Sequence, residues 1–240
     1  MLLVAPVQMV SLAGFVVVPH HADAIGDKRQ SVFEVMRAPP NRRRHPPHHK
    51  LLEHAAKWHP QAQVISARER GRVDRIGYAD LYERSRRIST VLEDLGIRQG
   101  ERVATLAWNT QAHFEVWYAI MGMGAVCHTL NPRLTAAQLA AMVRQSQARI
   151  VIASADLAPL AERIAEEASA IEKILTIDVS GGDTKDAGSP RVRALEPLIA
   201  GARGQARWGN FDETAPCGLC FTSGTTGAPK GVTYTHRSNF

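Results

Sequence analysis

The sequence predicts an α/β fold in which a parallel sheet is flanked by helices. Short apolar runs of strand length alternate with helical patterns from residue 51 onward, and this alternation is typical of parallel sheets. A hydrophobic content of 45% is ordinary for a globular chain with a core. A glycine-rich loop near residue 225 also follows an apolar run, and sheets of this class bind ligands at the carboxyl ends of their strands.

The first regular elements lie between residues 51 and 96. We expect a helix at Leu51–Trp58, a strand at Gln63–Ala67 and a long helix at Tyr78–Leu95, which Gly96 ends. The apolar face of the long helix recurs at steps of four and three, at Leu81, Ser85, Ile88, Leu92 and Leu95.

Strands and helices then alternate up to residue 178. We expect strands at Val103–Ala107, Ala125–Leu130, Arg149–Ser154 and Ile171–Asp178, and helices at about Ala112–Met121, from Thr135 to about Ser146, and at Leu157–Ala168. Thr135 and Gln138 have the spacing of a capping box. An aromatic stripe on the helix at about Ala112–Met121, formed by Phe114, Trp117, Tyr118 and Met121, is interpreted as core. Residues 180–191 are rich in Gly, Asp and Ser and predict a surface loop.

Residues 1–50 have a different composition. Met1–Val18 is apolar, but no Lys or Arg precedes it as in a signal peptide, and it is too short to span a bilayer comfortably. Pro39–Lys50 is basic and biased; its histidines favour a flexible tract over a metal site. We therefore expect residues 1–50 to be a poorly ordered leader or a gene-start artefact, and residues 51–240 to hold the folded part.

Charge and cysteine content narrow the function classes. A net charge of +6 and a pI of about 9.5 raise the possibility of a nucleic-acid partner, but no aromatic residues alternate with the arginines. Three cysteines without framework spacing indicate a reducing, cytoplasmic environment. Cys217 and Cys220 form a C-x-x-C pair, but no second pair completes a zinc site, so buried, inert cysteine is the favoured interpretation.

Phe221–Val232, which reads FTSGTTGAPKGV, has the features of a phosphate-binding loop. Gly224 and Gly227 allow close backbone approach, successive N–H groups favour an anion, and Lys230 adds a positive charge. A Walker-type loop requires lysine directly after glycine, whereas Lys230 follows Pro229. The Walker pattern therefore fails, and a solvated Gly/Ser/Thr linker is the alternative.

The same twelve residues resemble the phosphate-binding signature of the adenylate-forming (AMP-binding) enzymes, [YF]-T-S-G-T-T-G-x-P-K-G-V, without a mismatch. The segments Leu106–Asn109 and Gly122–Leu134 are similar to those of medium- and long-chain fatty acid–CoA ligases. The resemblance covers Leu51–Phe240 and implies the amino-terminal part of an acyl-CoA synthetase-like domain.

The resemblance also implies a reaction and a set of site residues. Family members convert ATP and a fatty acid to an acyl-adenylate and pyrophosphate, and the thiol of coenzyme A then displaces AMP. The residues implied to hold the β- and γ-phosphates of ATP are Thr222, Ser223, Gly224, Thr225, Thr226, Gly227 and Lys230, with Thr222 as the contact to Mg²⁺. No catalytic residue is identifiable, because the family's later motifs and its carboxyl-terminal domain would follow Phe240.

Two functions follow from this resemblance. One is a fatty acid–CoA ligase, present here as an amino-terminal fragment that we expect to be inactive alone. The alternative is a non-catalytic nucleotide-binding or interaction module derived from such an enzyme. We expect no nucleic-acid partner and no transmembrane segment. A homodimer, or complementation by a carboxyl-terminal part, would be the partner arrangement.

Overall fold

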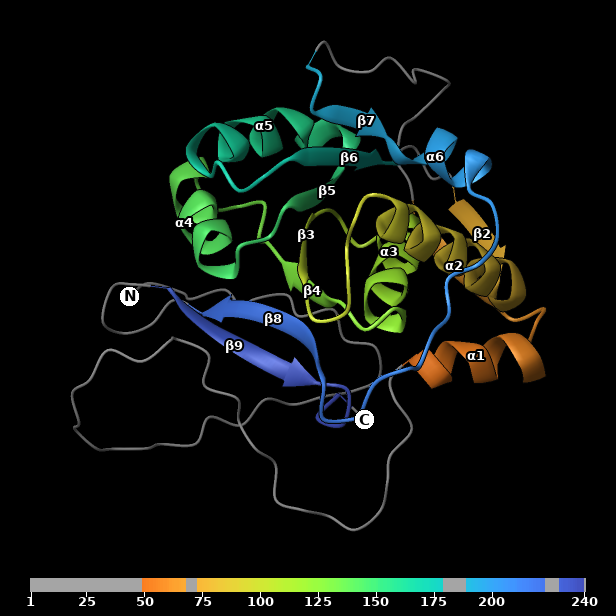
Figure 1. Cartoon of the computed structure of the whole chain (residues 1–240). Helices are drawn as coiled ribbons and strands as arrows, with labels where there is room; N and C mark the ends of the chain where they lie inside the picture. Colours follow the sequence, from red (N-terminus) through yellow and green to blue (C-terminus); the bar gives the residue numbers. More distant parts are fainter. Residues whose placement is uncertain (1–48, 68–72, 179–188, 223–228, 240) are drawn as a thin grey trace, which may run out of the picture. The chain divides into compact units, whose positions relative to one another are not determined.

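A seven-stranded sheet forms the centre of the fold, with the strand order β7-β6-β5-β3-β4-β8-β9 (Figure 1). The computed structural model describes residues 49–67, 73–178, 189–222 and 229–239. Neighbouring strands of this sheet are parallel, except that β9 is antiparallel to β8. The strands are β3 (Arg102–Leu106), β4 (Val126–Thr129), β5 (Ile150–Ser154), β6 (Lys173–Ile177), β7 (Val192–Ala194), β8 (Pro216–Thr222) and β9 (Lys230–Thr235).

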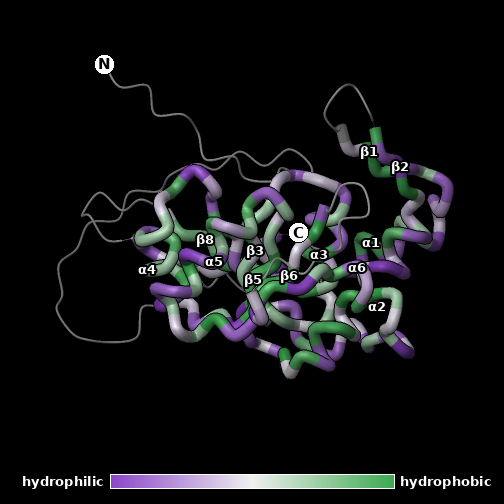
Figure 2. Tube along the Cα trace, turned by 90° about the horizontal axis from the view of Figure 1, so that it is seen from above, coloured by the Kyte–Doolittle hydropathy of each residue, from purple (hydrophilic) through white to green (hydrophobic). Residues whose placement is uncertain are grey.

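Helices cover both faces of the sheet. On one face, α2, α3 and α6 contribute Ile88, Val116 and Ile199 to a buried cluster with β3, β5 and β6. On the other face, α4 and α5 contribute Leu139 and Ile164 to a second cluster. In Figure 2, hydrophobic and hydrophilic segments both occur along these helices, as expected for helices that bury one side. The helices are α1 (His49–Trp58), α2 (Tyr78–Asp94), α3 (Gln111–Gly122), α4 (Ala136–Ser146), α5 (Ala158–Glu167) and α6 (Leu195–Gly201).

The α/β fold predicted from the sequence is confirmed. Every helix and strand expected between residues 51 and 178 is present, with ends shifted by no more than two residues. The predicted face of α2 is buried at Leu81, Ile88 and Leu92, and Gly96 follows the helix with a φ of 87°. The Thr135 hydroxyl accepts from the Gln138 backbone N–H at 3.3 Å, and Gln138 Oε1 accepts from the Thr135 N–H at 3.0 Å, so the capping box is real.

The sequence prediction missed four elements. A strand β2 (Val73–Gly77) pairs antiparallel with β1 (Gln63–Ala67) as a separate two-stranded sheet. The short elements β7 and α6 follow residues 179–188, which lie outside the described residues. The fourth is β9, which is antiparallel to β8 because the chain reverses between Thr222 and Lys230 and returns as a hairpin strand.

Helix α1 begins at His49, two residues before the predicted start. His49 is fully buried, and its ring meets the edges of Trp208 and Phe211, with centroids 6.1 and 5.5 Å away. Gly209 has a φ of 88°, and a Cβ there would lie 2.7 Å from His49 Nε2. A glycine at position 209 therefore lets the start of α1 pack closely against the segment that holds Trp208 and Phe211. Residues 1–48 of the predicted leader lie outside the described residues.

One arginine joins three helices on the α2/α3/α6 face. Arg84 Nε donates to both carboxylate oxygens of Glu115 at 3.0 Å, and Arg84 Nη1 and Nη2 donate to Glu196 at 2.9 Å. Glu115 is 1% exposed and also accepts from Gln111 at 2.8 Å. Burial raises the pKa of the Glu115 carboxyl, while Arg84 lowers it.

Replacing Arg84 tests how strongly the buried Glu115 depends on its partner. Arg84→Met should lower the free energy of unfolding by about 3 kcal/mol at neutral pH, because a buried carboxylate loses its counter-charge. The pKa of Glu115 should then rise further above its unfolded value. The folded state will therefore bind a proton more readily than the unfolded chain, and part of the lost stability should return as the pH falls. Urea unfolding at neutral and mildly acidic pH measures both effects.

The exposed Arg87 on the same helix provides a matched control. Arg87→Met should change the unfolding free energy by less than about 0.5 kcal/mol. A loss in Arg84→Met that is the same at both pH values would contradict the assignment to Glu115.

Candidate functional site

The hairpin β8–β9 carries the two described ends of the predicted phosphate-binding loop. Its register runs from Pro216 opposite Thr235 to Thr222 opposite Lys230. Thr222 and Lys230 therefore face each other at the mouth of the hairpin, and both side chains are exposed. The other predicted phosphate ligands, Ser223, Gly224, Thr225, Thr226 and Gly227, lie outside the described residues.

The hairpin mouth lies at the carboxyl edge of the parallel strands. β8 pairs parallel with β4, from Cys127 opposite Gly218 to Thr129 opposite Cys220. Thr222 therefore extends past the end of β4, on the edge where β3, β5 and β6 also end. Ligands of doubly wound sheets bind at this edge, where successive connections leave for opposite faces. The loop ends thus take the position expected of a ligand site.

Packing at the end of β8 fixes the direction in which the chain enters the loop. Phe221 packs against the α4/α5 core, and its ring lies 5.1 Å from the His128 ring. The Thr129 hydroxyl and the Cys220 thiol are 3.3 Å apart. Because side chains alternate along a strand, Thr222 points to the face opposite Phe221. Lys230, directly opposite Thr222, shares that face.

Gly231 in this motif has a packing reason. It lies opposite Phe221, and a Cβ added there would be 3.3 Å from Phe221 Cζ and 3.2 Å from Leu219 Cδ1. A side chain at this position would crowd the aromatic ring that anchors the end of β8. The glycine after Lys230 therefore serves the hairpin, where a Walker-type loop has Ser or Thr.

Polar contacts close the other end of the hairpin. Thr235 and Ser238 exchange hydrogen bonds: the Ser238 N–H donates to Thr235 Oγ1 at 3.1 Å, and the Thr235 N–H donates to Ser238 Oγ at 2.9 Å. Asn239 Nδ2 donates to Cys217 Sγ at 3.1 Å. An ion pair between Arg237 and Glu213 joins the turn after β9 to the segment before β8. These contacts restrain both strands that lead to the loop.

The cysteines near the hairpin are free, as expected from their environment. Burial raises the pKa of the Cys217 thiol to about 12 and also raises that of Cys220. Thiolate, the form that binds metals and attacks electrophiles, is therefore scarce at neutral pH. Among residues 49–67, 73–178, 189–222 and 229–239, no group of three or more His, Cys, Asp or Glu is arranged to hold a metal ion.

The sequence analysis assigned no role to His128, a buried polar residue of β4. It is fully buried beside Phe221, and neither ring nitrogen has a hydrogen-bond partner among the residues that the structure describes. Burial lowers the pKa of His128 to about 3, and the Arg102 guanidinium adds to this effect. The imidazole is therefore neutral at physiological pH. A histidine inside the predicted buried strand Ala125–Leu130 was the available sequence signal.

Two more side chains at the carboxyl edge were not predicted. Trp108 follows β3 and is 45% exposed; its backbone N–H donates to Ser154 at 3.1 Å and its indole N–H donates to Asp156 at 2.9 Å. His113, in the first turn of α3, lies 3.1 Å from Thr105 Oγ1 and 3.2 Å from the Trp108 carbonyl. Burial lowers the pKa of His113. These contacts tie the ends of β3 and β5 together.

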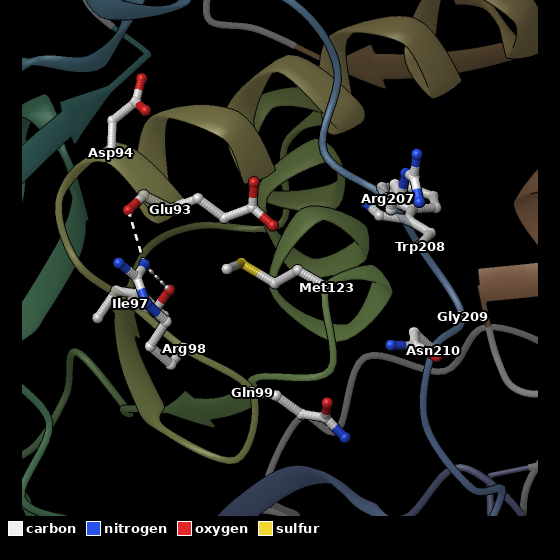
Figure 3. Close-up of a pocket in the computed structure, with 10 residues that line it drawn as sticks. All are labelled: Glu93, Asp94, Ile97, Arg98, Gln99, Met123, Arg207, Trp208, Gly209 and Asn210. Atoms are coloured by element: carbon white, nitrogen blue, oxygen red, sulfur yellow. Dashed lines mark hydrogen bonds between the residues drawn. The ribbon is translucent and has the colours of Figure 1, made fainter.

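The hollow drawn in Figure 3 lies away from this edge, near the amino ends of β3 and β4. It has a volume of about 800 Å³ and lies between the end of α2, Met123 and the segment Arg207–Asn210. Arg98 folds back within it, donating to the carbonyl oxygens of Glu93 at 2.9 Å and Ile97 at 3.1 Å. Thr222 and Lys230, the two predicted phosphate ligands that the structure describes, are not among the residues that line this hollow.

Comparison with known proteins identifies relatives of the same fold. The sequence profile described as "AMP-binding enzyme" matches residues 52–240. The chain is 38% identical over 191 residues to a 3-methylmercaptopropionyl-CoA ligase of Ruegeria pomeroyi, covering 78% of this chain and 35% of the relative. It is 36% identical over 190 residues to a medium-chain-fatty-acid–CoA ligase of Ectopseudomonas oleovorans, covering 78% and 34%. The chain thus spans about a third of the length of the curated relatives it matches.

A solved structure agrees with these sequence matches. The inhibitor-bound N-terminal domain of FACL13 from Mycobacterium tuberculosis superimposes with a TM-score of 0.67 at 26% identity, covering 80% of this chain and 45% of that chain. The similarity therefore extends from sequence to the three-dimensional arrangement of strands and helices.

Replacing His128 tests its buried, unpartnered state. The unfolded chain binds a proton near pH 6.5 whereas the folded chain does so near pH 3, so stability should fall as the pH drops through this window. His128→Leu should remove that slope and raise the free energy of unfolding at pH 7 by about 1 kcal/mol, because two unsatisfied polar atoms disappear. Thermal unfolding between pH 4 and 7 measures both.

A control for this experiment is His54→Leu, since His54 is exposed on α1. That variant should keep the acid slope of the wild type. An unchanged acid slope in His128→Leu would show that other groups cause the acid sensitivity.

Proposed function

Because the chain belongs to the AMP-binding enzyme family, we propose that it forms the ATP-phosphate-binding part of an acid–CoA ligase. The feature that supports this proposal best is the exposed pair Thr222–Lys230 at the carboxyl edge of the sheet. A hydroxyl and an ammonium group held opposite each other provide a hydrogen-bond donor and a positive charge for the same anion. The loop between them carries further hydroxyls and two glycines.

The chemical task of these residues is charge neutralisation. A carboxylate must approach the α-phosphate of a polyanion, and negative charge then builds on the departing pyrophosphate. Lys230 would bind the β- and γ-phosphates and offset that charge, and the Thr222 hydroxyl would hold a phosphate oxygen or a bound Mg²⁺. Mg²⁺, when bound, would neutralise part of the phosphate charge. Phe221 and Gly231 would keep the two loop ends in place during this step.

The acid that we propose as substrate is a fatty acid, with coenzyme A as the thiol that accepts the acyl group. The names of two relatives at 36% and 35% identity, a medium-chain and a long-chain fatty acid–CoA ligase, support this choice. The Ruegeria relative is named for a sulfur-containing propionyl substrate, so a short aliphatic acid belongs in any substrate panel.

Binding of ATP tests the role of Lys230. Lys230→Ala should weaken MgATP binding at least about tenfold, because a charge-assisted contact to phosphate is lost. Lys230→Arg should retain most of the affinity, since the positive charge remains. Equilibrium dialysis with labelled ATP gives the dissociation constants without requiring catalysis.

Lys173 provides the matched control, because it lies at the amino end of β6, on the opposite edge of the sheet. Lys173→Ala should bind ATP like the wild type. Equal affinities for the Lys230 and Lys173 variants would rule out Lys230 as a phosphate ligand.

Pyrophosphate exchange distinguishes a ligase from a non-catalytic module. The assay uses ATP, Mg²⁺ and acids from three-carbon to long-chain, with the chain alone and with any polypeptide encoded directly downstream. We expect exchange only in the mixture, and the responding acid will define the chain length. ATP binding without exchange in either case would favour the nucleotide-binding module.

A further inference from the structure

The charged side chains at the carboxyl edge of the sheet are separated by sign. In the described part of the connections that leave the parallel strands, the one cation is Arg133, which follows β4. Lys230 adds a second cation to this edge, at the start of the antiparallel β9. Two carboxylates, Asp156 and Asp178, follow β5 and β6. The cations therefore lie on the side of β4, β8 and β9, and the carboxylates on the side of β5 and β6 (Figure 1).

A hydrogen-bonded turn fixes the backbone at Arg133. Its N–H donates to Asn131 Oδ1 at 3.0 Å, and the Leu134 N–H donates to the Asn131 carbonyl oxygen at 3.1 Å. The turn lies between the buried Leu130 and Thr135, which caps α4. Arg133 is thus presented from a defined position at the end of β4.

The guanidinium of Arg133 has no task in the fold that the structure shows. The side chain is exposed, and within the described residues it forms no ion pair and no hydrogen bond. Arg84 and Arg149, by contrast, bind carboxylates of neighbouring elements. The positive charge of Arg133 therefore stays available to a ligand.

Strand pairing brings Arg133 close to the exposed pair Thr222–Lys230. Thr129 lies opposite Cys220, so the turn two residues further along is level with Thr222. Neighbouring strands are about 4.8 Å apart, which places the turn one strand spacing from Thr222 and two from Lys230. Two long side chains, one from each side of β8, can contact the same ligand across such a distance.

We propose that Arg133 is the second cation of the phosphate-binding site and contacts the polyphosphate chain of a nucleoside triphosphate together with Lys230. The proposal rests on the proposed function, because it extends the site that Thr222 and Lys230 define. A guanidinium binds phosphate oxygens through two parallel N–H groups, whereas the ammonium group of lysine is a compact charge. Two cations on different strands favour an extended polyanion over a single phosphate, because only the longer ligand contacts both.

The two cations approach the edge from opposite faces of the sheet. Lys230 points to the face opposite Phe221, whereas the turn at Arg133 leads to α4 on the face where Phe221 packs. Asp156 disfavours an anion at the end of β5, since the Trp108 indole N–H that binds it at 2.9 Å is a neutral donor. The phosphate chain should therefore lie above β8, between the two cations.

Equilibrium dialysis of the full chain with labelled ATP and Mg²⁺ tests the proposal. Arg133→Gln should weaken ATP binding about tenfold, because a charge-assisted contact to phosphate is lost. Inorganic pyrophosphate, measured as a competitor of labelled ATP, should lose affinity by a similar factor. AMP lacks the β- and γ-phosphates, so its affinity should change less than about twofold. Arg133→Lys should retain part of the ATP affinity, since the charge remains but the paired N–H groups are lost.

Arg193→Gln provides the matched control. Arg193 is an exposed arginine of β7, at the opposite end of the sheet, and its side chain also has no partner in the described part of the chain. This variant removes the same charge and should bind ATP like the wild type. Thermal unfolding of both variants should match that of the wild type, which separates a lost contact from misfolding.

The outcomes distinguish this proposal from the proposed function. Weaker ATP binding in Lys230→Ala but not in Arg133→Gln would overturn the role of Arg133 and leave the phosphate site intact. A wild-type protein that binds neither ATP nor pyrophosphate would overturn both. Equal losses for AMP and ATP in Arg133→Gln, or weaker binding of coenzyme A with ATP unchanged, would also overturn the proposal, because Arg133 would then serve a different anion.

Discussion

The parallel pairing of β8 with β4 is the constraint on which the candidate site depends. It joins residues about ninety positions apart in sequence through three residue pairs, ending with Thr129 opposite Cys220. Without this pairing, the loop after β8 would have no fixed relation to the ends of β3, β5 and β6. The backbone groups of β8 are also paired on its other side by β9, so the strand that delivers the loop is bound on both edges. The local sequence forms the loop, but long-range strand pairing decides where it lies.

Glu115 and His128 are both buried, but they differ in how their polar atoms are satisfied. The buried Glu115 is bound by Arg84, which also binds the exposed Glu196, so this network of ion pairs links α2, α3 and α6. The ring nitrogens of His128 have no hydrogen-bond partner in the described part of the chain, and the ring stays neutral beside Phe221. The Arg84 network holds three helices together. His128, by contrast, lies beside Phe221 at the end of β8, where the chain enters the loop.

Local patterns in the sequence were sufficient for the α-helices and strands between residues 51 and 178, apart from β2 (Val73–Gly77). The periodic face of α2 and the capping box at Thr135 are encoded within a few residues, so both could be predicted. The motif at Phe221–Val232 likewise identified the two loop ends that the structure brings together at Thr222 and Lys230. The antiparallel return of β9, the pairing of β8 with β4 and the burial of His128 depend on tertiary contacts. No pattern within a short window contains that information.

Thr222 and Lys230 are directly opposite each other in the hairpin. Whether their side chains share one face of the sheet therefore depends on the register of β9 against β8. Side chains along a strand change face at every residue, so a slip of β9 by one position would turn Lys230 away from Thr222 and toward the side of Phe221. Adding or removing a pair of residues in the loop would preserve the face, whereas a single insertion within β9 would not. The register of β9 against β8, as well as the identity of the two residues, therefore decides whether Thr222 and Lys230 can act on the same anion.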